Sequence, residues 1–176
     1  MRTFLYASVL LFPLVLWAGK PAPRFSLKDL NGQTVTLDSL LAKGPVILDF
    51  WATWCTYCDE ELDLLNEFQK EFGDHLTVVA ISLDSPKTLA KIRAMKESHH
   101  WQFPILLDPS KKWKARYKVF ALPTVFVISP EGEIVKTHFG YNPSQEENLR
   151  EEIRALIAEY LARQAPQDTT RNPSGQ

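Results

Sequence analysis

Residues 46–58, VILDFWATWCTYC, decide the fold of this chain. The first six of them, 46–51, form an apolar run interrupted only by Asp49, which is typical of a buried β-strand. Residues 60–72 then place Leu64, Leu65, Phe68 and Phe72 on one helical face. The stretch therefore predicts a strand, a short connection and a helix that begins close to the two cysteines.

Cys55 and Cys58 are the only cysteines among the 176 residues. A bridge across so short a loop removes little entropy from the unfolded chain, so stabilisation is not their purpose. A thiol at a helix N-terminus faces unpaired backbone N–H groups, which stabilise its thiolate. We therefore expect Cys55 to be the nucleophile and Cys58, one helical turn later, to resolve the mixed disulfide.

Metal binding is the alternative use of two cysteines. A strong zinc signal needs about four ligands, and the four histidines lack the spacing of a zinc finger; they are His75, His99, His100 and His138. Soft thiolates suit Cu(I), so a copper chaperone using both cysteines and a histidine remains a hypothesis. We favour redox chemistry that needs no metal and no cofactor.

The N-terminus and the overall charge narrow the functional class. A net charge of −1 gives no sign of nucleic-acid binding. Arg2 precedes an uncharged run of 15 residues, Phe4–Ala18, which predicts an export signal over residues 1–19. The run is shorter than the roughly 20 residues of a membrane span. Because no small-x-small pair marks a cleavage site, an N-terminal membrane anchor or a buried helix is the alternative.

One globular domain is expected over residues 20–163. We predict a hairpin at 25–37, strands at 76–83, 105–107, 124–128 and 134–139, and helices following Ser85-Pro86 and over 111–117. Asp38 or Ser39 should cap a short helix, and Ser144 with Glu147 should form the capping box of the last helix. The polar residues 164–176 predict a disordered tail.

These motifs resemble the thioredoxin superfamily, and within it the exported TlpA/ResA-type thiol–disulfide reductases. The resemblance covers about residues 23–162 and is carried by Pro23-Arg24-Phe25, the run from Leu48 to Cys58, and Ala121-Leu122-Pro123-Thr124. It implies an α/β, thioredoxin-like fold, with a central mixed β-sheet flanked by helices. It also implies an N-terminal β-hairpin and an αβ insertion between Asp84 and Leu107.

The resemblance further implies a substrate-binding set. Pro123 matches the cis-proline of the family, which faces the cysteines and leaves the Leu122 backbone free to pair with a substrate chain. An ordinary proline at a strand start is the alternative. Trp54, immediately before Cys55, completes the expected substrate contacts.

Two acidic residues complete the catalytic set that the resemblance implies. Asp49 interrupts a buried strand, where a lone carboxylate is costly, and it is expected to accept the proton of Cys58 rather than to be a structural accident. Glu61 matches the acidic residue that ResA-like proteins place near their cysteines. An exposed glutamate that stabilises the helix dipole is the alternative for Glu61.

The implied activity is reduction of protein disulfides in the periplasm or another extracytoplasmic space. A membrane electron donor of the DsbD/CcdA type would recharge the protein, and apocytochrome c is an implied substrate in cytochrome c biogenesis. The chain lacks the proline common before the second cysteine in reductases, because Tyr57 stands there, and residues 76–83 lack the lysine of thioredoxins proper. These departures leave the redox potential open.

Two other redox functions are alternatives. A dithiol oxidase would use the same couple in reverse, although the acids Asp49 and Glu61 disfavour an accumulated thiolate. A thiol peroxidase is suggested by residues 23–44, which also resemble peroxiredoxins. However, Phe50 occupies the place of the proline that those enzymes carry before their reactive cysteine.

Overall fold

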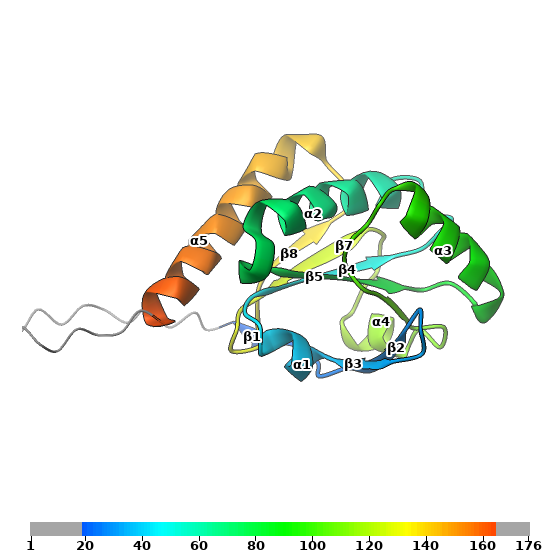
Figure 1. The fold of residues 1–176 in the computed structure, drawn as a ribbon, viewed down its shortest axis with the longest axis horizontal. Coiled ribbons are helices and arrows are strands. Elements are labelled where there is room, and N and C mark those ends of the chain that lie inside the picture. Colours follow the sequence, from blue (N-terminus) through cyan, green and yellow to red (C-terminus); the bar gives the residue numbers. More distant parts are fainter. Residues whose placement is uncertain (1–18, 165–176) are drawn as a thin grey trace, which may run out of the picture.

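The computed structural model describes residues 19–164, which form one mixed β-sheet with helices on both faces (Figure 1). The strand order is β1-β8-β7-β4-β5-β6-β2-β3. The strands are β1 (Lys20–Pro21), β2 (Ser26–Asp29), β3 (Thr34–Thr36), β4 (Val46–Trp51), β5 (Thr77–Ser82), β6 (Ile105–Leu107), β7 (Thr124–Ile128) and β8 (Glu133–Phe139). The predicted thioredoxin-like fold is confirmed.

Strand β4 occupies the centre of this sheet. It pairs in parallel with β5 and antiparallel with β7, and β5 pairs in parallel with β6. The hairpin of β2 and β3 extends the sheet beyond β6, and β8 carries β1 on the other side. The carboxyl ends of β4 and β5 therefore lie at the same sheet edge, directly before the cysteines.

The helices are α1 (Leu37–Leu41), α2 (Cys58–Phe72), α3 (Leu89–Ser98), α4 (Lys112–Arg116) and α5 (Glu146–Gln164), with 3₁₀ turns at Gly73–His75, Pro86–Thr88 and Pro143–Gln145. Helices α2, α3 and α5 cover one face of the sheet, and α1 and α4 cover the other (Figure 1). Helix α3 and strand β6 are the expected αβ insertion. The predicted export segment and tail fall outside the described residues except at their borders, and Gln164 belongs to α5 rather than to a disordered tail.

Alternation along β4 separates two hydrophobic clusters. Ile47 and Trp51 pack with α2 and α5 in what we call the α2-side cluster. Leu48 and Phe50 point to the opposite face and join the α1-side cluster. Because side chains alternate with a period of two, Asp49 lies on the same face as Ile47 and Trp51, toward α2.

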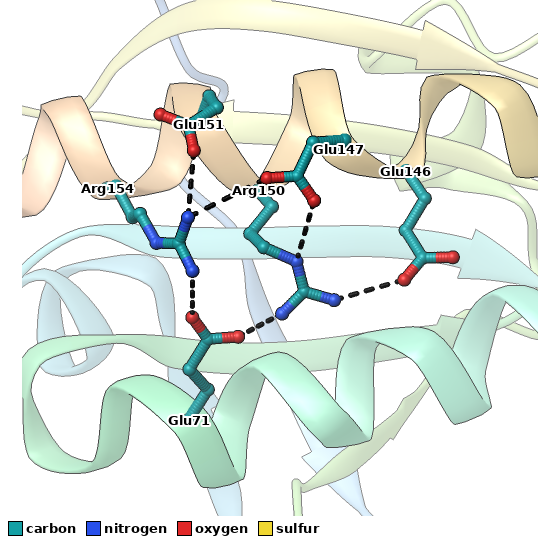
Figure 2. Close-up of polar contacts among 6 residues, drawn as sticks. All are labelled: Glu71, Glu146, Glu147, Arg150, Glu151 and Arg154. Atoms are coloured by element: carbon teal, nitrogen blue, oxygen red, sulfur yellow. Dashed lines mark hydrogen bonds and ion pairs between the residues drawn. The ribbon is translucent and has the colours of Figure 1, made fainter.

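Helices α2 and α5 are joined by charged side chains (Figure 2). Glu71 of α2 contacts both Arg150 and Arg154 of α5, and its distance to Arg154 is 2.8 Å. The same two arginines pair with acidic residues of their own helix, namely Glu146, Glu147 and Glu151. Arg150 also lies 4.7 Å above the ring of Phe68, so one residue combines ion pairs with packing.

Two predicted helix caps are wrong. Thr36, not Asp38 or Ser39, caps α1: its Oγ1 accepts from the Ser39 N–H at 3.1 Å, and the Ser39 hydroxyl oxygen accepts from the Thr36 N–H at 3.2 Å. Asp38 instead pairs with Arg24 at 2.6 Å. Neighbouring residues of similar capping ability compete for one position, and spacing alone does not choose between them.

The last helix shows the same competition. Asn142 caps the 3₁₀ turn before α5, and its side-chain oxygen accepts from the Ser144 N–H at 3.1 Å. The predicted capping box of Ser144 and Glu147 is therefore wrong, and Glu147 contacts Arg150 instead. The buried face of α5 carries Leu149, Ile153, Leu156 and Ile157.

Candidate active site

Cys55 and Cys58 form a disulfide between the end of β4 and the beginning of α2. Helix α2 begins at Cys58, and the Cys58 N–H donates to the Cys55 carbonyl at 3.4 Å. A tight turn before the helix, rather than the expected helical turn, therefore separates them. Cys58 is only 1% exposed, whereas Cys55 is partly exposed. A large substrate thus reaches Cys55 before Cys58.

The turn that carries Cys55 is anchored through Thr53. The carboxylate of Asp84 accepts from the Thr53 N–H at 2.9 Å and from the Thr53 hydroxyl at 2.8 Å. On the other side, the ammonium group of Lys91 donates to the Thr53 carbonyl at 2.8 Å. Asp84 is buried and also accepts from the Ser82 hydroxyl at 2.9 Å. This anchoring holds the residues before the nucleophile in one position.

Asp49 is a buried carboxylic acid on the face of β4 that α2 covers. It is 0% exposed, and neither of its oxygens has a hydrogen-bond partner of good geometry within residues 19–164. Burial raises the pKa of Asp49 well above its usual value, the charge of Glu61 raises it further, and the Phe50 backbone N–H offsets part of the rise. Such an acid exchanges its proton at a higher pH than an exposed aspartate.

Glu61 lies three residues after Cys58 and is only 5% exposed. The alternative of an exposed glutamate at the helix end is therefore wrong. Burial raises the pKa of Glu61 from 4.5 to about 7. A pocket of about 20 Å³ adjoins Glu61, with His138 and Tyr141 also in its lining. That volume is large enough for about one water molecule, so Glu61 lies between the interior and a recess of that size.

An open groove of about 420 Å³ lies beside Cys55. Four segments line it: Trp54 and Tyr57 flank the cysteine, Leu83 follows β5, Lys111 and Lys114 come from the α4 region, and Phe120 and Leu122 come from the loop before β7. Trp54 is 68% exposed and Phe120 is 84% exposed. The peptide bond between Leu122 and Pro123 is cis, and Pro123 is buried immediately before β7. The partly exposed Cys55 therefore opens into a groove with large exposed aromatic side chains in its lining.

The structure sorts the predicted site residues into two groups. Trp54, Cys55 and Leu122 line the groove. Cys58, Asp49, Glu61 and Pro123 are buried and do not line it. Within residues 19–164, no group of three or more histidine, cysteine or acidic side chains could hold a metal ion.

Sequence reasoning missed four residues at this site: Lys111, Lys114, Phe120 and Asp84. A signal existed only for Asp84, because an acid directly after a strand that pairs in parallel with β4 must lie near the end of β4. The other three come from segments more than 50 residues away in sequence, and no spacing relates them to the cysteines.

Similarity to known proteins identifies the family of this chain. The AhpC/TSA family matches residues 18–137. The thioredoxin-like protein YneN of Bacillus subtilis is 40% identical over 124 residues, which are 69% of this chain and 71% of that protein. The thiol–disulfide oxidoreductase ResA of Bacillus cereus is 34% identical over 122 residues, which are 69% of each chain.

A solved structure agrees with these matches. A candidate thiol:disulfide interchange protein DsbE from Chlorobium tepidum superposes with a TM-score of 0.73 at 29% identity, over 79% of this chain and 96% of that one. ResA and the structural neighbour thus share a thiol–disulfide description, and the neighbour has the fold of this chain.

Proposed function

Because this chain belongs to the AhpC/TSA family and is a thiol–disulfide oxidoreductase, we propose that it reduces disulfide bonds of other proteins outside the cytoplasm. The observation that carries the proposal is the pairing of a partly exposed Cys55 with a buried Cys58 beside an open groove. This arrangement offers one sulfur to the substrate and keeps the other for the second step.

The proposed reaction begins with the reduced protein. The Cys55 thiolate attacks a substrate disulfide, so a bond from Cys55 to the substrate forms, the substrate S–S bond breaks, and the released thiolate takes up a proton. The Cys58 thiolate then attacks the sulfur of Cys55. The Cys55–Cys58 disulfide forms, and the second substrate thiol leaves. Two electrons have then passed to the substrate, and an external dithiol must return them.

Asp49 and Glu61 are the proposed proton carriers for Cys58. Cys58 must lose its proton before it attacks, and Asp49 lies on the face of β4 that packs against α2. The pKa of Glu61, raised to about 7, suits an exchange of that proton with water in the adjoining recess. Burial of both acids, in a part of the molecule where charge is costly, supports this role.

Trp54, Leu122 and Pro123 are the proposed substrate contacts. Trp54 offers a broad exposed apolar surface beside Cys55. Leu122 precedes β7, so its backbone stands outside the strand ladder and can pair with an extended substrate chain. Pro123, which follows it across a cis bond, removes the N–H at that point.

The proposed location and partners rest on the N-terminus and on the resemblance. The apolar run Phe4–Ala18 supports export or membrane tethering. Between residues 19 and 164, no helix is long and apolar enough to cross a membrane. A membrane dithiol donor of the DsbD/CcdA type is the proposed source of electrons, and apocytochrome c is a proposed substrate.

The deciding measurement is the reduction potential of the purified protein, from thiol trapping in glutathione or dithiothreitol buffers, with Cys55→Ser as the control. A potential near or below about −270 mV supports the reductase, and one near about −120 mV makes the protein an oxidase instead. The absence of a reversible couple overturns thiol–disulfide exchange. Cys58→Ser should accumulate a mixed disulfide with substrate, and Cys55→Ser should not.

A further inference from the structure

One part of the groove beside Cys55 carries uncompensated positive charge. Lys111 and Lys114 both line it. Neither ammonium group belongs to an ion pair or hydrogen bond within the described residues, in contrast to Lys91 and Lys96, whose ammonium groups donate to backbone carbonyls. Two free cations therefore face the path along which a substrate approaches the reactive sulfur.

This charge is local rather than general. The chain has a net charge of −1, but five of the eight residues 111–118 are lysine or arginine, and residues 109–130 contain no acid. The nearest acid in sequence, Asp108, is 1% exposed, and its carboxylate accepts from the backbone N–H groups of Trp113 and Lys114 at 2.9 Å each. Its carboxylate therefore faces backbone donors and makes no ion pair with the ammonium group of Lys111 or Lys114.

The cations of this segment are divided between two tasks. Lys112 and Arg116 lie over the ring of Trp113, each 5.2 Å from its centre. Lys111 and Lys114 make no such contact and line the groove instead. The free pair is thus available to a ligand, and Lys112 provides a matched cation outside the groove.

Aromatic surface adjoins the free cations. Phe120 is 84% exposed and Trp54 is 68% exposed, and both line the same groove. Exposed apolar side chains that gather in one place mark a binding surface. Asp59 and Glu60, in the first turn of α2, are outside the lining and carry the opposite charge.

From this arrangement we infer that the groove selects substrate segments in which acidic residues flank the disulfide cysteine and an apolar side chain follows. The inference rests on the proposed function and specifies its substrate class. Lys111 and Lys114 attract the acidic residues, and Phe120 and Trp54 cover the apolar one. The acids of α2, outside the lining, repel the same substrate charge and so favour binding of the acidic residues on the lysine side of the groove.

The test uses three peptide disulfides with the same apolar residue and with acidic, neutral or basic residues beside the cysteine. The reduced full chain is mixed with each, and thiol release is followed in time. Each rate is divided by the rate of the same peptide with dithiothreitol, because flanking charge also changes the reactivity of the peptide itself. We expect the acidic peptide to react about tenfold faster than the basic one at low salt, with the difference shrinking as salt rises.

Two charge variants locate the effect. Lys111→Gln/Lys114→Gln should remove most of the preference, whereas Lys43→Gln/Lys112→Gln loses the same charge from lysines outside the groove and should keep it. Equal rates for the acidic and basic peptides overturn the inference and leave the proposed function intact. A preference that survives in Lys111→Gln/Lys114→Gln also overturns it. Failure to reduce any of the peptides, the neutral one included, overturns the proposed function itself.

Discussion

Asp84 accepts both polar hydrogens of Thr53, the backbone N–H and the hydroxyl, and thereby holds the turn two residues before Cys55. The two residues come from the ends of adjacent parallel strands, β4 and β5. The position of the nucleophile therefore depends on a carboxylate that is not itself close to the reacting sulfur in sequence. Asp84 is a positioning residue in the proposed reaction.

Asp84→Ala should both destabilise the protein and slow the attack by Cys55. It leaves the donors of partly buried Thr53 and buried Ser82 without an acceptor, which costs about 3 kcal/mol. We expect the rate of mixed-disulfide formation to fall about tenfold, because the turn loses its fixed geometry. Urea unfolding of the oxidised protein and stopped-flow exchange measure the two effects.

Asp29→Ala is the matched control for Asp84. Asp29 also accepts two backbone N–H groups, from Asn31 and Gln33 at 2.8 Å each, but in the β2–β3 hairpin. It should lower stability and leave the exchange rate unchanged. If both variants slow exchange in proportion to their loss of stability, Asp84 has no positioning role.

Glu61 should make the protein less stable as the pH rises from 4.5 to 7. In that interval the folded protein keeps a proton on Glu61, because burial raises the pKa of this residue to about 7. The unfolded chain has already lost that proton, because there the pKa of Glu61 has its ordinary value of 4.5. The free energy of unfolding should therefore fall by about 1.4 kcal/mol per pH unit, or about 3 kcal/mol in all. Denaturant unfolding of the oxidised protein at several pH values measures this slope.

Glu61→Gln should remove that part of the pH dependence. The variant should match the wild type near pH 4.5 and exceed its stability above pH 7, because no charge is buried at this position. Glu67→Gln, at an exposed position of the same helix, is the control and should keep the wild-type slope. Parallel stability profiles for Glu61→Gln and the wild type would contradict the raised pKa.

Asp49→Asn should slow the second step of exchange and spare the first. If Asp49 takes the proton of Cys58, its loss should prolong the life of the mixed disulfide about 100-fold near neutral pH. The attack by the partly exposed Cys55 should proceed at its former rate. Rapid acid quenching followed by mass spectrometry separates the two steps. An equal slowing of both would assign Asp49 a structural role only.

Local patterns predicted the elements that carry this site. The apolar run 46–51 corresponds to β4, and the apolar stripe on residues 60–72 corresponds to most of α2. Both could be predicted because the spacing of apolar residues distinguishes a buried strand from an amphipathic helix. The Cys55–Cys58 pair was visible for a different local reason, because four consecutive residues contain it. The cis bond before Pro123 came from resemblance, not from periodicity.

Long-range features of the site were beyond such patterns. The α4 region and the loop before β7, with Phe120, meet Cys55 because the sheet places β7 beside β4. The burial of Glu61 was likewise undecided, because the first turn of α2 contains three acids and the sequence does not say which one faces inward. Tertiary packing settles both points.

Glu71→Gln should loosen the contact between α2 and α5 (Figure 2). It removes the acid that both Arg150 and Arg154 share across the two helices. We expect a loss of about 1 kcal/mol in unfolding free energy at low salt, and a smaller loss in 1 M salt, where screening is strong. Urea unfolding at the two salt concentrations measures both.

Glu151→Gln is the control for this network. Glu151 contacts Arg154 within α5 alone, so its removal should cost a few tenths of a kcal/mol at most. If the two variants lose the same free energy of unfolding, the ion pairs between α2 and α5 contribute no more to stability than the ion pair within α5.

The alternation of β4 makes this protein favourable for engineering. Val46, Leu48 and Phe50 turn away from the cysteines and pack in the α1-side cluster, while Asp49 turns toward α2. Free-energy changes at sites without shared contacts are nearly additive. Thermostabilising substitutions on α1, which packs against the face of the sheet away from α2, can therefore be combined with changes at Asp49 where the two sites are more than about 7–10 Å apart, so that durability and redox behaviour can be selected on opposite faces of one sheet.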